Sequence, residues 1–126
     1  MFTSRSDLFP LPNGKDWLLK DRPTTWVGDD FEVTSSVGTT TDFSSIPKLM
    51  RWYAAPATGK HRWAAVPHDK GYRDNPLNWP RKKWDELYRD IARSEGTRPA
   101  KAKVLYTGLR LFGWAAWNKH RSNDGN

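Results

Sequence analysis

The chain has 126 residues and a mass of 14.6 kDa, which is the length of one domain and excludes a multidomain protein. Eight Trp, four Tyr and five Phe supply an aromatic core, so we expect disorder only at the ends of the chain. The absence of cysteine excludes disulfides, thiolate zinc sites and a cysteine nucleophile.

The formal net charge of +7 is unevenly distributed along the sequence. Residues 1–50 contain 5 basic and 7 acidic residues, whereas residues 51–126 contain 16 basic and 7 acidic residues. The first part therefore has a net charge of −2 and the second part +9. A positively charged surface in the second part could bind nucleic acid, anionic lipid or an acidic protein, and the sign of the charge does not distinguish these partners.

The first third of the sequence predicts extended structure. Residues 1–14 contain two prolines and end in Asn13-Gly14, which is typical of an extended arm that leads into a turn. Short runs with strand composition follow, separated by turn residues; they cover residues 16–20, 24–27 and 31–35. We expect these runs to form a small antiparallel sheet.

The rest of the chain has helical periodicity. Prolines near helix starts and apolar residues spaced three and four apart predict helices over residues 47–53, 61–73, 81–94 and 99–119. In the last helix Leu105, Leu109, Phe112 and Ala116 share one apolar stripe. We therefore predict an α+β fold in which the sheet packs on three or four helices. One globular domain would cover residues 15–121, and residues 122–126 would be a disordered tail.

The pattern with most chemical content is His68-Asp69-x-x-Tyr72, followed by Asp85 in the next predicted helix. If the two helices run antiparallel, Asp85 can hydrogen-bond to the His68 ring. That contact fixes the tautomer and leaves the other ring nitrogen as a base toward water. Asp69 points about 100° away around the helix, where its carboxylate is free for a hard cation such as calcium.

This pattern resembles the catalytic helices of secreted phospholipase A2. The resemblance covers two helices and implies that His68 is the general base on a water and Asp69 a calcium ligand, with Tyr72 and Asp85 as their support. Asp42 precedes a Ser-Ser-x-Pro helix start and is either a second metal-binding carboxylate or a residue that caps a turn.

A longer resemblance includes, in chain order, residues 40–47, residues 64–69, Asp85 and residues 111–117. In this order the four blocks are similar to the phage and prophage family catalogued as domain of unknown function 1353. The resemblance implies a bacteriophage gene product and brings no settled activity. We expect such a protein in the host cytoplasm when it is made, or in the virion.

Several alternatives stay open at this stage. His68-Asp69 could mark a helix start favoured by the helix dipole, and Asp85 could belong to an ion-pair face with Arg81 and Arg89. A metal-dependent His-Asp phosphohydrolase would add His61 as a ligand, but His61 precedes His68 by only seven residues. The two would share one helix, whereas that enzyme class needs separate helices.

The basic second part of the chain suggests two kinds of binding surface, one for nucleic acid and one for an anionic membrane. Basic residues interleaved with aromatic ones can bind single-stranded nucleic acid, but most of the aromatic residues fall on apolar helical stripes, which makes nucleic acid less favoured as a partner. The last helix could instead lie on an anionic membrane. The basic residues concerned are Arg81, Lys82, Lys83, Arg98, Lys101, Lys103, Arg110, Lys119 and Arg121.

The functional hypothesis is a phage-encoded hydrolase that acts on a lipid or cell-envelope substrate. His68, Asp85 and Tyr72 would form its catalytic site, and Asp69 and Asp42 would bind a divalent cation such as calcium. The alternative is a non-enzymatic virion component, for example of the tail, that contacts other phage structural proteins through the arm of residues 1–14. In that case the same polar residues form a structural network.

Overall fold

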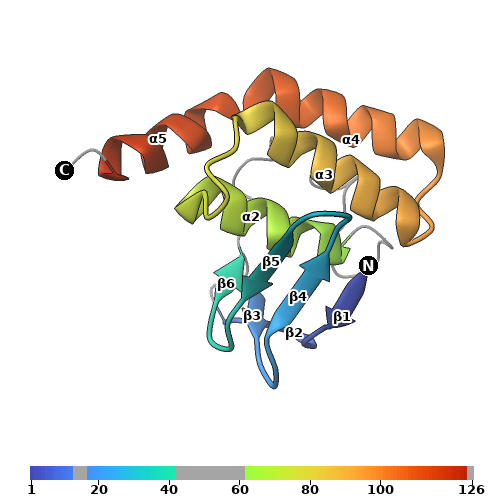
Figure 1. Ribbon diagram of the computed structural model, residues 1–126, viewed down its shortest axis with the longest axis vertical. Coiled ribbons are helices and arrows are strands. Elements are labelled where there is room, and N and C mark those ends of the chain that lie inside the picture. The colour runs from blue at the N-terminus through green and yellow to red at the C-terminus, as the bar shows by residue number, and fades with distance from the viewer. Residues whose placement is uncertain (13–16, 42–61, 125–126) are drawn as a thin grey trace. The chain divides into compact units, whose positions relative to one another are not determined.

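The structure is a computed structural model that describes residues 1–12, 17–41 and 62–124 (Figure 1). It divides into two compact units, Met1–Phe43 and Ser44–Asn126. The first unit is built of strands and the second of helices, which confirms the predicted α+β class. Each unit is described by itself.

Two three-stranded antiparallel sheets make up the described part of the first unit. One has the order β1-β4-β5 and the other β2-β3-β6. Strands β4 and β5 show the alternation of a half-buried sheet, since Trp26 and Val33 are paired across the strands and buried while Thr25 and Thr34 face outward. The strands are β1 (Phe2–Ser4), β2 (Leu8–Pro10), β3 (Trp17–Leu19), β4 (Thr24–Val27), β5 (Glu32–Ser35) and β6 (Thr40–Thr41).

The beginning of the chain corrects the prediction of a separate arm. It is extended, as expected, but β1 pairs with β4 and β2 with β3. Ser6, between these strands, is buried and its hydroxyl lies 2.8 Å from Asp21 Oδ1. Backbone groups in extended segments need partners, and the sheets of the same chain provide them.

The second unit contains a short 3-10 helix, η1 (Arg62–Ala64), and four α-helices, α2 (Ala65–Asp74), α3 (Arg81–Ser94), α4 (Pro99–Phe112) and α5 (Trp114–Asp124) (Figure 1). The stripe predicted on α3 is buried and forms much of the core, through Trp84, Leu87, Tyr88 and Ile91. The helix expected over residues 47–53 lies outside the described residues. No helix in the described part of the chain is long and apolar enough to cross a membrane.

The last predicted helix is wrong in one respect, because it is broken at Gly113 into α4 and α5. Arg81 donates to the backbone carbonyls of Leu109 and Arg110, at 2.9 and 3.1 Å. A donor inserted at helix carbonyls is a recognised cause of a kink. Any side chain at position 113 would also collide, since its Cβ would lie 2.6 Å from the hydroxyl of Tyr72.

The end of the chain differs from the predicted pattern at two further points. Phe112, expected on the buried stripe with Leu105 and Leu109, is 54% exposed. Helix α5 continues to Asp124, so residues 122–124, which were expected to be disordered, are helical. Arg121 in α5 donates to the carbonyls of Tyr72 and Arg73 at the end of α2, and these bonds stabilise the last turns of the chain.

A close contact between α2 and α3 sets the geometry of the site. A Cβ at Gly71 would lie 2.1 Å from the ring of Trp84, so only glycine allows this approach. Asn75 ends α2 in the left-handed conformation, with φ 44°, and its Oδ1 accepts hydrogen bonds from Trp84 Nε1 and Trp79 N. The turn and the indole together hold the two helices antiparallel, as predicted.

Candidate functional site

Helix α2 presents His68 and Tyr72 on one face, because residues four apart lie above each other on a helix. Pro67 precedes His68 but lies in the first turn of α2. Backbone N–H groups there have no partner within the helix, so a proline is tolerated. Both side chains are 2% exposed, and their rings lie 4.2 Å apart.

Asp85 on α3 is the centre of the site and is fully buried. Its Oδ1 accepts hydrogen bonds from His68 Nε2 at 2.8 Å and from the Tyr72 hydroxyl at 2.6 Å. Its Oδ2 accepts from Arg110 Nη1 at 2.8 Å and from Arg81 Nη1 at 3.4 Å. The structure thus brings together His68, Tyr72 and Asp85, the three residues predicted from their spacing.

The two arginines were not predicted as part of the site. Arg81 is four residues before Asp85, and sequence analysis indicated only an ordinary ion pair between them. Arg110 lies on α4, 25 residues after Asp85, and no local pattern places it there. A buried carboxylate is costly unless it is paired and hydrogen-bonded, and the arginines complete that pairing.

The charges at the centre stabilise one another. Burial lowers the pKa of His68, but the hydrogen bonds and charges of Asp69 and Asp85 outweigh burial and leave this pKa above its usual value of 6.5. Burial raises the pKa of Asp85, but the hydrogen bond and charge of His68, together with Tyr72 and Arg110, leave that pKa below 3.8. Burial and the Asp85 charge raise the pKa of Tyr72, so its hydroxyl stays a donor.

The other ring nitrogen of His68 faces a different environment. Because an ionised carboxylate is only an acceptor, Nε2 carries the proton shared with Asp85, and Nδ1 is the basic nitrogen of the neutral ring. Asp69 Oδ1 lies 3.9 Å from Nδ1, and the Asp69 side chain is 13% exposed. The ring of Tyr88 packs edge-on against the imidazole at 5.5 Å, and its buried hydroxyl has no hydrogen-bond partner among the described residues. Sequence analysis placed Tyr88 only in the core.

The described residues do not make up a calcium site by themselves. They contain no group of three or more His, Cys, Asp or Glu side chains placed to hold a metal, and Asp69 alone offers few of the six to eight oxygens that calcium takes. Asp42 and His61 lie outside the described residues. The predicted cation therefore stays a prediction.

The comparisons with known proteins point to one family. The model described as "Protein of unknown function (DUF1353)" matches residues 17–109. The chain belongs to this family. The matched range includes β3 to β6, α2 and α3 and most of α4. Of the four residues described above as hydrogen-bonded to Asp85, it includes His68, Tyr72 and Arg81 and ends one residue before Arg110. No curated protein and no solved structure matches the chain.

The raised pKa of His68 predicts how stability depends on pH. When the pKa of a group is higher in the folded protein than in the unfolded chain, protonation of that group stabilises the folded protein. This stabilisation is complete at a pH below the unfolded pKa and is lost as the pH rises through the folded pKa. From about pH 6.5 upward, we expect the wild type to lose stability relative to the His68→Gln variant. Urea unfolding of both proteins between pH 6 and 9 measures this difference. A difference in unfolding free energy that is constant with pH, or grows with it, would contradict the assignment.

Proposed function

We propose that this DUF1353 protein is a bacteriophage-encoded hydrolase that cleaves an ester bond in a lipid or cell-envelope substrate. One observation supports it above the others: the His68 ring is held through Nε2 by Asp85, and Nδ1 is directed away from that carboxylate. Tyr72 donates to the same oxygen of Asp85. This is the arrangement in which a carboxylate fixes the tautomer of a histidine base.

The proposed reaction uses the neutral form of His68. Nδ1 accepts a proton from a water molecule as the water oxygen attacks the ester carbonyl carbon. The tetrahedral intermediate then expels the alkoxide, which takes the proton from Nδ1, and the products are a carboxylic acid and an alcohol. Asp85 stabilises the imidazolium formed in between, and Arg81 and Arg110 keep Asp85 ionised. The Asp69 carboxylate, on the Nδ1 side of the ring, also stabilises this imidazolium.

The cation predicted with Asp69 and Asp42 remains part of the proposal as an expectation. If calcium binds there, it would polarise the carbonyl oxygen of the substrate. Comparing rates in the presence of calcium and in the presence of a chelator tests this point separately from the role of His68.

The first experiment asks whether the protein hydrolyses an ester and how the rate depends on pH. Candidate substrates are phospholipid vesicles, a soluble short-chain ester and peptidoglycan fragments that carry acetyl esters, with released acid measured by titration. Because the base must be neutral, we expect kcat/KM to rise with pH and to level off above the pKa of His68, with a midpoint above 6.5. Absence of hydrolysis on every substrate, or a rate that falls over this range, would overturn the proposal.

A second candidate function is favoured by the burial of the site. His68 is 2% exposed, and the four hydrogen bonds to Asp85 join α2, α3 and α4. Such a network would also suit a non-enzymatic virion component that binds other phage proteins. In that case His68 and Asp85 variants lose stability or assembly and no hydrolysis is found. In the hydrolase, a folded His68 variant loses the reaction.

A further inference from the structure

Helix α4 has an apolar surface that the core does not use. Its inner face buries Ala102, Leu105 and Leu109. On the outer face Val104 is 45% exposed and Leu111 61% exposed. Because the two residues are seven apart, they lie on the same side of the helix, two turns from each other.

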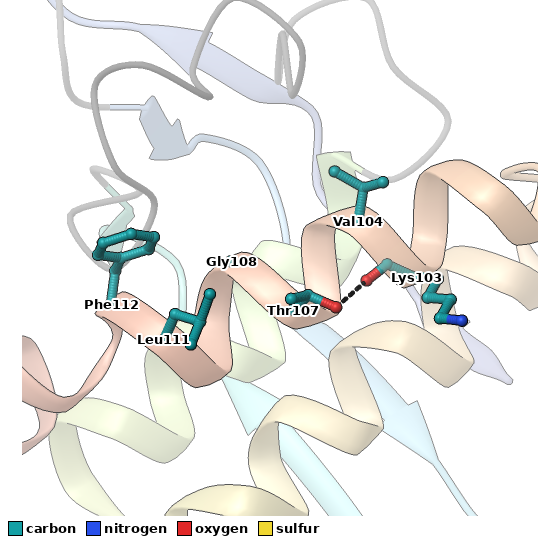
Figure 2. A pocket seen from close by; sticks show the side chains of 6 residues that line it. All are labelled: Lys103, Val104, Thr107, Gly108, Leu111 and Phe112. Atoms are coloured by element: carbon teal, nitrogen blue, oxygen red, sulfur yellow. Dashed lines mark hydrogen bonds between the residues drawn. The ribbon is translucent and has the colours of Figure 1, made fainter.

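The outer face is shaped as a shallow pocket of about 340 Å³. Figure 2 shows Val104 and Phe112 projecting from the same side of α4. Phe112, the last residue of α4, is 54% exposed, and Trp114, the first residue of α5, is 57% exposed. The pocket is lined by Lys103, Val104, Thr107, Gly108, Leu111 and Phe112.

Positive charge surrounds this surface. Between Glu95 and Asp124 the sequence contains six Lys and Arg and no acidic residue. Helical geometry at 100° per residue places Lys101 about 60° to one side of Val104 and Lys103 about 100° to the other. The apolar stripe is therefore flanked by a cation on each side, which is the pattern of helices that lie in an anionic membrane surface.

The surroundings of the stripe disfavour two other occupants. Pairing with the same face of a second copy would bring like charges together, which is unfavourable. Single-stranded nucleic acid binds by stacking on exposed aromatic rings, but the stripe is aliphatic at its centre. Two nearby rings are already covered by arginines, since Arg89 lies over Tyr106 and Arg121 over Trp117, which leaves Phe112 and Trp114 as the exposed rings at one end of the stripe.

We propose that the outer face of α4, with Trp114, binds the surface of an anionic phospholipid bilayer. Val104, Leu111 and Phe112 enter the boundary between headgroups and acyl chains, and the flanking lysines contact the anionic headgroups. The surface deepens the proposed function, because it specifies a membrane lipid as the substrate class. It is nevertheless tested by binding alone.

The experiment is co-sedimentation of the full chain with vesicles of phosphatidylcholine alone and of an equal mixture with phosphatidylglycerol. The His68→Gln variant is used, so that no hydrolysis alters the lipid. We expect binding to the anionic vesicles that weakens as salt is added. The Val104→Asp/Leu111→Asp double variant should bind at least roughly tenfold more weakly. Val37→Asp, which changes a 49% exposed residue of β-rich unit 1, is the control and should bind like its parent.

Three results would overturn the membrane proposal. The first is equal binding to both vesicle types, and the second is unchanged binding by the folded double variant. The third is absence of vesicle binding, with dimerisation or single-stranded DNA binding that the double variant abolishes. Vesicle binding without ester hydrolysis by the wild type would support the surface and overturn the hydrolase. Hydrolysis of vesicle lipid at equal rates by the wild type and the Val104→Asp/Leu111→Asp variant would support the hydrolase and overturn the membrane-binding surface.

Discussion

Replacing Asp85 by alanine should lower the free energy of unfolding by about 3–5 kcal/mol. The carboxylate is fully buried and accepts hydrogen bonds from His68, Tyr72, Arg81 and Arg110. Without it, the guanidinium groups of Arg81 and Arg110 lose the carboxylate that they share, and the buried Tyr72 hydroxyl and His68 Nε2 lose their acceptor. The cost is a large part of the roughly 5–15 kcal/mol by which a typical domain is stable.

Urea unfolding followed by circular dichroism measures this effect. Asp90→Ala is the matched control, because Asp90 is on the same helix, is 64% exposed and forms its ion pair within the described part of the chain with its neighbour Arg89. A change within about 0.5 kcal/mol is expected there. If Asp85→Ala costs less than about 1 kcal/mol, the buried network does not hold the helices together. Failure of the variant to fold agrees with the prediction, provided that Asp90→Ala folds.

The sequence predicted the elements whose signal is local. The apolar stripe on α3 predicted that helix to within a residue or two, because burial of one face stabilises an amphipathic helix. The stripe consists of Trp84, Leu87, Tyr88 and Ile91. The pairing of His68 with Asp85 was also predictable, because the α2–α3 turn is short and antiparallel neighbours follow from it. Fold class and the centre of the site therefore followed from spacing.

What the sequence missed depends on contacts between distant segments. Arg110 reaches Asp85 only because α4 packs against α3, and nothing around Arg110 specifies that partner. The break at Gly113 has its cause in Arg81 and Tyr72, which lie more than thirty residues earlier. The pairing of β1 with β4 and of β2 with β3 was not predicted, because strands of three residues are too short to show an alternating pattern.

The second large effect concerns catalysis. Replacing His68 by glutamine should reduce ester hydrolysis by about 10²–10⁴-fold, the usual contribution of a general base. The glutamine amide can still donate to Asp85 in place of Nε2, so the network keeps one donor at that position. It has no group that accepts a proton in place of Nδ1. The substitution therefore separates the role of His68 as a base from its role in holding Asp85.

Two further variants sharpen the comparison. His120→Gln makes the same substitution on α5. His120 interacts with the site only through charge, with Asp69 among its partners, so we expect a rate far closer to that of the wild type than to that of His68→Gln. Tyr72→Phe removes one donor to Asp85 but leaves the base in place. We expect it to lower the rate less than His68→Gln does and to shift the midpoint of the pH profile, because Tyr72 acts through Asp85 on His68.

The most direct test of the proposed function is the initial rate of fatty-acid release from phospholipid vesicles by the wild type, His68→Gln and His120→Gln, at a pH above the His68 pKa and with folding of each protein verified. We predict hydrolysis by the wild type and by His120→Gln, and a loss of about 10²–10⁴-fold in His68→Gln. Equal rates in folded His68→Gln and wild type would contradict this prediction.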